Sequence, residues 1–123
     1  MAKSSNDQRI DYVEFSVGDI ARSRDFYGKA FGWSFKDYGP SYCEFNDGRL
    51  TGGFALGGGE EAHGSNKAGG PLVILYADDL DATQRRLEAA GGTIVKPPYA
   101  FPGGRRFHFA DPDGYELAVW SAK

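Results

Sequence analysis

Two stretches of the chain, residues 13–36 and 73–96, carry the same order of apolar and polar positions, displaced by sixty residues without a gap. Each stretch opens within a short apolar run rich in β-branched residues, which predicts a strand at Ile10–Val17 and another at Leu72–Ala77. A repeat this long in a chain of 123 residues indicates two copies of one supersecondary unit rather than a solenoid. Two such units have to bury their open faces against each other, and a ligand is expected at the surface that they share.

Each predicted strand is followed by a predicted helix. Asp19 and Asp79 come directly before the helical pattern, and an aspartate carboxylate is a good acceptor for the free N–H groups of a first helical turn. Gly32 and the pair at 91–92 predict the helix ends. Three further strands are expected after each helix, at Trp33–Asp37, Tyr42–Asn46 and Gly53–Leu56 in the first copy and at Thr93–Lys96, Arg105–Ala110 and Tyr115–Trp120 in the second. The predicted unit is therefore β-α-β-β-β, used twice, in an α+β fold.

These units divide the chain. Residues 1–8 are predicted to form a flexible tail, and residues 9–123 a single domain made of module one (9–56), a linker (57–70) and module two (71–122). The linker, GGGEEAHGSNKAGG, is Gly-rich and polar, which favours a flexible connection; a mobile flap over a pocket is the alternative. Lys96–Gly104 reads KPPYAFPGG, and its three prolines are expected to prevent a regular strand ladder.

Composition excludes several classes of protein. With 41% hydrophobic and 15% aromatic residues, the chain is expected to be globular. The net charge of −3 with interspersed signs gives no basic stripe for nucleic acid. No apolar run approaches the ~20 residues of a membrane span, and Met1–Gln8 lacks the apolar core of a signal peptide. A single cysteine, Cys43, fits a reducing compartment. We therefore expect a cytoplasmic protein with no nucleic-acid or membrane partner.

Three sequence segments resemble a known family. FSVGDIARSRDFYGKAFGW in the first copy, with YADDLDATQRRLEAAGG and FADPDGYELAVW in the second, are similar to the vicinal oxygen chelate superfamily. That superfamily includes glyoxalase I, extradiol dioxygenases, fosfomycin-resistance enzymes and bleomycin-resistance proteins. The resemblance covers roughly residues 9–121. It implies a glyoxalase-like domain whose two βαβββ modules form curled mixed sheets around a cavity, and a homodimer.

The resemblance also implies one divalent metal, held by His, Glu or Gln on the first and a late strand of each module. The matching positions here are Tyr12, Leu72, Ala118 and a copy-one residue among 52–54. Apart from the phenol of Tyr12, which is a poor ligand when neutral, these side chains offer no donor to a metal. The sequence therefore predicts no metal and no other cofactor. The alternative is a rebuilt site made of three carboxylates and one imidazole, from Glu14, Glu44, Glu116 and His108.

Side-chain parity along the strands predicts what lines the cavity. Apolar residues of one phase, such as Phe15, Cys43 and Phe107, should pack under the helices, and the opposite phase should face the ligand. The predicted ligand-binding residues are Tyr12, Glu14, Tyr42, Glu44, Tyr76, Arg106, His108 and Trp120. Aromatic walls with a few ionisable groups are typical of a small-molecule pocket.

Two of these residues are catalytic candidates. Glu14 and His108 are suited to proton transfer, but Glu14 also suits a structural ion pair with Arg106, and His108 a simple hydrogen-bonded strand position. Asp111 and Asp113, in the DPDG turn, are expected to cap backbone N–H groups.

Three functions are therefore open. The first, which we favour, is a metal-free protein that binds an aromatic or cationic small molecule, as bleomycin-resistance members do. The second is a metal-independent acid–base enzyme, and the third is a metal-dependent lyase or dioxygenase with a shifted ligand register. A module that contacts another protein through its Pro-rich segment is a further alternative.

Overall fold

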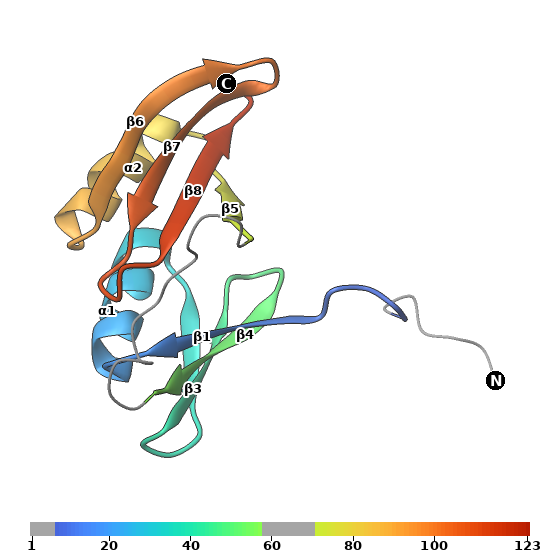
Figure 1. The fold of residues 1–123 in the computed structure, drawn as a ribbon, viewed down its shortest axis with the longest axis vertical. Coiled ribbons are helices and arrows are strands. Elements are labelled where there is room, and N and C mark those ends of the chain that lie inside the picture. The colour runs from blue at the N-terminus through green and yellow to red at the C-terminus, as the bar shows by residue number, and fades with distance from the viewer. Residues whose placement is uncertain (1–6, 58–70) are drawn as a thin grey trace.

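The computed structural model describes residues 7–57 and 71–123. Most of the predicted tail and linker, including His63, lies outside these ranges. Module one contains β1 (Tyr12–Val17), α1 (Ile20–Phe31), β2 (Ser34–Asp37), β3 (Tyr42–Asn46) and β4 (Thr51–Leu56). Module two contains β5 (Val73–Tyr76), α2 (Leu80–Ala89), β6 (Thr93–Phe101), β7 (Gly104–Ala110) and β8 (Glu116–Ser121). Figure 1 shows the two modules one above the other.

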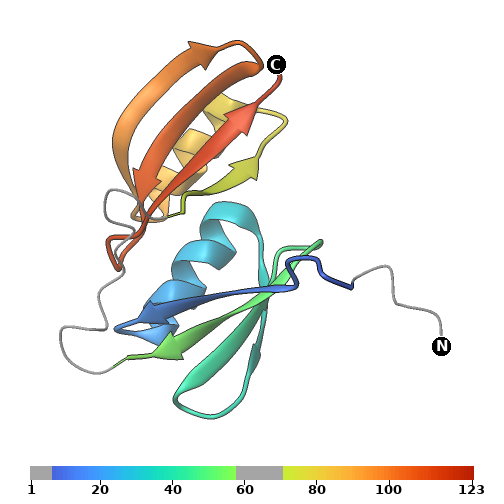
Figure 2. The same ribbon diagram turned by 45° about the vertical axis from the view of Figure 1, so that its right-hand side comes forward.

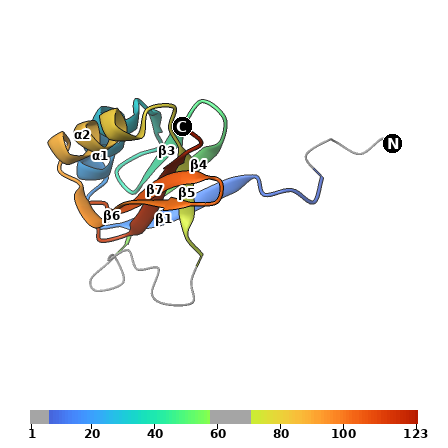
Figure 3. The same cartoon turned by 90° about the horizontal axis from the view of Figure 1, so that it is seen from above.

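Each module folds into one four-stranded mixed sheet covered by its helix. The strand orders are β1-β4-β3-β2 and β5-β8-β7-β6, with the first strand of each module parallel to its last. The predicted α+β fold with two βαβββ modules is therefore confirmed. The sheets remain separate and do not close into a barrel (Figure 2). The modules meet through their helices, which lie next to each other when the molecule is seen from above (Figure 3). Within the described ranges, no helix is long and apolar enough to cross a membrane.

The helix ends follow from the residues that the sequence singled out. The Asp19 carboxylate accepts from the N–H of Arg22 at 3.1 Å, and the Asp79 carboxylate accepts from the N–H of Ala82 at 3.0 Å. Gly32 ends α1 in the left-handed region, with φ of 74°, where a residue without Cβ is favoured. Both predicted caps are confirmed.

The core lies between each sheet and its helix, and it has the predicted parity. Phe15, Cys43 and Phe107 are buried, as are Val17, Phe45 and Phe109 of the same phase. In module one, the Trp33 ring stacks between Tyr27 and Phe45, with centroid distances of 4.5 and 4.6 Å. Burial raises the pKa of the Cys43 thiol, which fits its expected role as a core residue rather than a nucleophile.

The Pro-rich segment differs from its expectation. β6 continues through it to Phe101 and pairs with β7. The ladder shifts register between Ile94 and Lys96 and again between Lys96 and Tyr99, where Pro97 and Pro98 lie. Each proline removes a donor, so the prolines interrupt the ladder locally without ending the strand.

The DPDG turn between β7 and β8 caps its own backbone as predicted. One carboxylate oxygen of Asp111 accepts from the N–H of Asp113 at 2.9 Å and from that of Tyr115 at 3.0 Å. The turn also has a second role, which was not predicted from the sequence. The carboxylates of Asp111 and Asp113 form hydrogen bonds with residues of module one.

Asp113 binds the first turn of α1. Its Oδ1 accepts from the N–H of Gly18 at 2.8 Å and from Arg22 Nη2 at 2.7 Å, and its Oδ2 accepts from the Ser23 hydroxyl at 3.2 Å. The Asp113 side chain is 1% exposed, so these contacts form a buried, charge-assisted connection between modules.

Asp111 and Tyr115 complete this connection. The Tyr27 hydroxyl donates to Asp111 Oδ2 at 2.7 Å, and the Tyr115 hydroxyl donates to the carbonyl of Ser16 at 3.1 Å. Burial raises the pKa of Asp111 and, well above its ordinary value, that of Tyr27. The raised pKa of Tyr27 keeps its phenol neutral, so that its hydroxyl donates to Asp111.

We predict that Tyr27→Phe lowers the free energy of unfolding by about 1–3 kcal/mol, because Asp111 Oδ2 then loses its donor while remaining buried. The measurement is urea unfolding of the whole chain. Tyr38→Phe is the matched control, because Tyr38 is 53% exposed and removal of its hydroxyl should cost little. Equal stability of the two variants would contradict this account of the connection.

Candidate functional site

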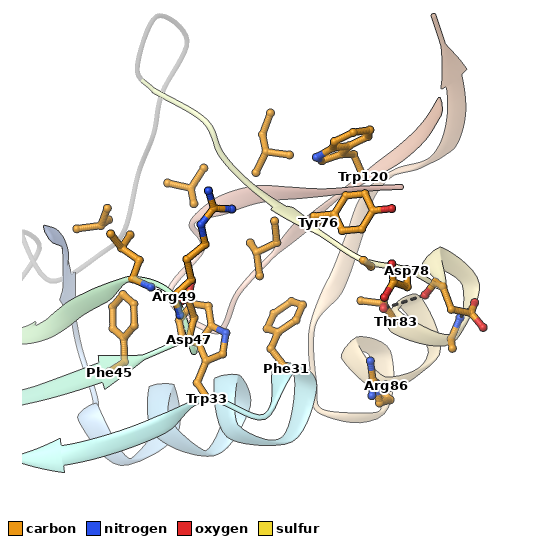
Figure 4. Close-up of a pocket in the computed structure, with 18 of the residues that line it drawn as sticks. Phe31, Trp33, Phe45, Asp47, Arg49, Tyr76, Asp78, Thr83, Arg86 and Trp120 are labelled. Carbon is orange, nitrogen blue, oxygen red and sulfur yellow. Dashed lines mark hydrogen bonds between the residues drawn. The ribbon is translucent and has the colours of Figure 1, made fainter. Parts of the chain in front are cut away.

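A cavity of about 980 Å³ lies between the two modules (Figure 4). Its walls are mainly apolar and aromatic, and they come from α1, β1, β3 and the β3–β4 turn on one side and from β5, α2 and β8 on the other. The lining residues are Val13, Phe15, Phe31, Trp33, Phe45, Asp47, Arg49, Leu50, Val73, Ile74, Leu75, Tyr76, Ala77, Asp78, Asp79, Ala82, Thr83, Arg86 and Trp120. Both tryptophans of the chain are among them.

The cavity lies where the repeat is broken. The β7–β8 turn, residues 111–115, docks onto α1, and the corresponding β3–β4 turn, residues 47–50, faces α2 across the cavity. Asp47 Oδ1 accepts from the N–H groups of its own turn, at 2.8 Å from Arg49 and 2.6 Å from Leu50. Within the described part of the chain, no hydrogen bond joins this turn to α2.

Helix α2 also lacks the side chains with which α1 binds the β7–β8 turn. Sixty residues after Arg22 and Tyr27, the second copy has Ala82 and Leu87, which cannot hydrogen bond to an incoming turn. Thr83, the counterpart of Ser23, donates to the carbonyl of Asp79 at 2.9 Å instead. One end of the contact between modules is therefore tied by buried carboxylates, and the other end is open.

A few charged groups stand among the apolar walls. Asp79 caps α2, and Asp78 lies 3.6 Å from Lys123. The side chains of Arg49 and Arg86 have no hydrogen bond or ion pair with residues 7–57 or 71–123. Aromatic walls with sparse charges suit a small organic ligand, since rings provide contact area and the charges orient polar substituents.

Three of the predicted site residues form a cluster on the face of sheet one that points away from α1. The Tyr42 hydroxyl donates to Glu14 Oε1 at 3.0 Å, which leaves its oxygen to accept from Tyr12, 2.6 Å away. Removal from water and these two hydrogen bonds raise the pKa of Tyr42. Glu44 lies on the same sheet, paired in register with Lys36 and Gly53.

The outer face of sheet two carries a longer chain of contacts. Glu116 Oε2 lies 2.8 Å from His108 Nδ1, and His108 Nε2 lies 3.0 Å from the Tyr99 hydroxyl. Arg106 Nε donates to the same hydroxyl. With a proton on Nδ1, the imidazole accepts at Nε2, so the Tyr99 hydroxyl can donate to His108 while it accepts from Arg106.

Aromatic rings continue this face toward the cavity. Trp120 meets Tyr76 edge to face, with centroids 4.9 Å apart, and lies 6.1 Å from Phe101. Of the eight predicted ligand-binding residues, Tyr76 and Trp120 line the cavity, and the other six lie on the two sheet faces. The ion pair between Glu14 and Arg106 that the sequence suggested does not form. Each residue instead has a hydrogen bond within its own module, Glu14 with Tyr42 and Arg106 with Tyr99.

Sequence reasoning missed Tyr99, Phe101 and the cavity wall of module one. Both residues lie in the Pro-rich segment, which was not expected to form a regular strand, and the register shifts in β6 bring them to the outer face. Trp33 and Phe45 had the phase of core residues, and the gap between modules leaves them beside the cavity.

The residues at the family's metal positions do not fit a metal. Glu14 pairs with Gly53 as Ile74 pairs with Ala118, so Gly53 is the copy-one counterpart of Ala118. A Cβ at Gly53 would collide with the Tyr42 hydroxyl and lie 2.7 Å from that of Tyr12, so this space is already filled.

The rebuilt metal site is not assembled either. Its candidate donors are divided, with Glu14 and Glu44 in module one and His108 and Glu116 in module two. Among the residues that the structure describes, no three His, Cys, Asp or Glu side chains come together in a way that could hold a metal ion.

Comparison with known proteins decides the family. The sequence profile of the Glyoxalase/Bleomycin resistance protein/Dioxygenase superfamily matches residues 9–119. The chain belongs to this superfamily. The resemblance inferred from the sequence motifs is therefore confirmed.

Individual superfamily members are similar to much of the chain. Anthracycline biosynthesis protein DnrV of Streptomyces peucetius is 36% identical over 86% of this chain, which spans only 45% of that protein. A probable lactoylglutathione lyase of Vibrio cholerae is 30% identical, with 93% of this chain and 91% of that protein covered. A superfamily structure from Burkholderia phytofirmans has a TM-score of 0.77 at 21% identity over 93% of this chain and 100% of that chain, which shows the shared fold.

We predict that two neighbouring glycines of β4 respond differently to alanine. A Cβ at Gly52 would collide with the Phe45 ring and the backbone carbonyl of Val13, which cannot move without disturbing the β1–β4 pairing, so Gly52→Ala should cost about 1–3 kcal/mol or more. Gly53→Ala should cost less, because it displaces the hydroxyl ends of two tyrosine side chains that are not fully buried. Thermal unfolding of both variants checks the order, and the reverse order would be inconsistent with the packing described.

Proposed function

We propose that this domain binds a planar aromatic small molecule between its modules without using a metal. The observation that carries the proposal is the placement of rings on opposite sides of the cavity, with Phe31, Trp33 and Phe45 from module one and Tyr76 and Trp120 from module two. Flat ligands gain contact area and stacking energy from such walls. The open end of the module contact gives the ligand room to enter.

The relatives support an aromatic ligand. DnrV and a second relative, DauV of Streptomyces sp. (strain C5), which is 35% identical over 86% of this chain, are named for anthracycline biosynthesis. An anthracycline is built on a flat fused-ring system. Because this chain spans less than half of either protein, their role comes to this domain only as a proposal. The lack of donors at the superfamily's metal positions supports metal-free binding over lyase or dioxygenase chemistry, since those positions offer no ligand set to a metal.

We predict that a hydroxyanthraquinone quenches the intrinsic fluorescence of the protein, because both tryptophans line the cavity. Tyr76→Ala should weaken the binding measured by calorimetry by about 2- to 10-fold, the range expected for losing one aromatic contact. Tyr76 is 48% exposed, so its removal should leave the fold intact. Tyr38→Ala is the matched control, because Tyr38 is a similarly exposed tyrosine outside the cavity. Unchanged fluorescence across a panel of planar compounds, or equal affinities of the two variants, would refute the proposal.

A second candidate function is acid–base catalysis by the same domain. The observation that favours it is the orientation of His108 by Glu116, at 2.8 Å, with Tyr99 at its other ring nitrogen. A carboxylate that holds one nitrogen fixes the tautomer, as in many catalytic histidines. Glu14, the other catalytic candidate, has Tyr42 as its hydrogen-bond partner and remains a prediction.

This second function predicts proton exchange on a bound ligand. An aromatic ligand with an acidic C–H group should exchange that hydrogen in D2O faster with protein than without, as followed by NMR. His108→Asn should abolish the acceleration while calorimetric binding persists. If exchange is no faster than in buffer for ligands that bind, binding without catalysis is the function.

The oligomeric state and the cellular location of the protein are also proposals. Superfamily members often dimerise, and the sheet faces away from the helices carry exposed apolar side chains, including Tyr12, Ile74 and Tyr76. We propose that a second copy covers these faces, which light scattering at several concentrations would show. A cytoplasmic location is likewise proposed.

A further inference from the structure

The guanidinium of Arg106 is held in one orientation by two aromatic residues, Tyr99 and Phe101. Its Nε donates to the Tyr99 hydroxyl, and its central carbon lies 5.5 Å from the Tyr99 ring centroid and 5.8 Å from that of Phe101. Among residues 7–57 and 71–123, nothing accepts a hydrogen bond from its two terminal nitrogens. Arg106 therefore presents a fixed fork of unused donors, a geometry that matches the two oxygens of a carboxylate.

The position of this fork is set by strand register. Tyr76 pairs with Trp120, Trp120 with Arg106, and Arg106 with Tyr99, so the four residues form one row across β5, β8, β7 and β6. Neighbouring strands are about 4.8 Å apart. Arg106 thus lies one strand beyond the Tyr76–Trp120 pair that lines the cavity, within the span of a fused-ring ligand.

The charges around Arg106 favour an anion. Lys96 Nζ lies 4.4 Å from the Tyr99 ring centroid and adds a second positive charge to this face. The carboxylate of Glu116 is bonded to His108, and its negative charge is thus turned toward the imidazole. The neighbouring Arg105 differs from Arg106 in having a carboxylate partner. Its Nη1 lies 3.7 Å from Asp81 Oδ1 in an ion pair.

We propose that Arg106 is the anchor for an acidic oxygen substituent, a carboxylate or phenolate, on the planar ligand whose rings contact Tyr76 and Trp120. This inference rests on the proposed function and narrows the ligand to anionic aromatic compounds. The partly buried guanidinium replaces water at the anion with two parallel charge-assisted hydrogen bonds. Tyr99, itself bonded to His108, is a positioning residue that fixes the plane of the fork.

The experiment compares anthraquinone-2-carboxylate with its methyl ester by calorimetry, because the two ligands share the rings and differ in the acidic oxygen. The unaltered protein should bind the acid at least about tenfold more tightly, as expected for a charge-assisted pair. Arg106→Gln should remove this preference, with the loss of affinity falling mainly on the acid. Arg105→Gln removes the same charge from the neighbouring residue and should keep the preference.

Two further variants locate the anchor and test its positioning. Arg49→Gln and Arg86→Gln each remove one of the two arginines of the cavity wall, and a loss of preference in either of them but not in Arg106→Gln would overturn the assignment. Tyr99→Phe should reduce the preference for the acid without changing the affinity for the ester, a split that a general loss of stability would not produce.

The outcomes separate the two proposals. If neither ligand binds the unaltered protein, the proposed function fails. If both bind with equal affinity, or the ester or a cationic analogue binds more tightly, the function stands and the role of Arg106 is wrong. This comparison needs no variant, so it can refute the role of Arg106 even if Arg106→Gln fails to fold.

Discussion

The buried carboxylate of Asp113 accepts hydrogen bonds from Gly18, Arg22 and Ser23, and so it fixes one module against the other. A buried charge is tolerated only when it is paired and hydrogen bonded, which makes the geometry of this contact demanding. Asp111 and its buried donor Tyr27 extend the same contact. Because the two sheets share no strand pairing, the position of one sheet relative to the other depends on this connection and on the packing of α1 against α2.

The cavity is a consequence of making this connection only once. An exact repeat would have placed the same hydrogen-bonding groups at both ends of the contact between modules. Instead, Arg22 and Tyr27 have apolar counterparts in Ala82 and Leu87, and the β3–β4 turn uses Asp47 to cap itself. Because the second copy departs from the repeat, the two ends of the contact between modules differ. One end is fixed by hydrogen bonds to buried carboxylates, and the other is open and has aromatic walls. Loss of donors at the metal positions, with Tyr42 filling the space beside Gly53, fits a site that binds through rings.

Local patterns predicted the modules, and long-range contacts were beyond them. The Asp19 and Asp79 caps and the buried phase of Phe15 and Phe107 follow from spacing alone, because caps and strand parity are local properties. The contact between Asp113 and Ser23 joins residues ninety positions apart. No local pattern in either segment indicates that the two residues are partners.

The candidate site was predicted in part for the same reason. Tyr76 and Trp120 were placed in the pocket by parity and do line the cavity, whereas Tyr99 was missed because its Pro-rich segment was not expected to form a strand. Trp33 and Phe45 show a further limit of prediction from strand parity. Parity marks them as core residues, and they line the cavity only because the opposing module does not pack against them.

The measurement that tests the account most directly is the affinity for a planar aromatic carboxylate of chelator-stripped protein, determined by calorimetry and repeated with added Zn²⁺, Mn²⁺ or Ni²⁺. We predict binding by the stripped protein with an affinity that the ions leave unchanged, because the rings and Arg106 supply the contacts. Binding that appears only with a metal ion would contradict the account and return the domain to the metal-dependent members of its superfamily.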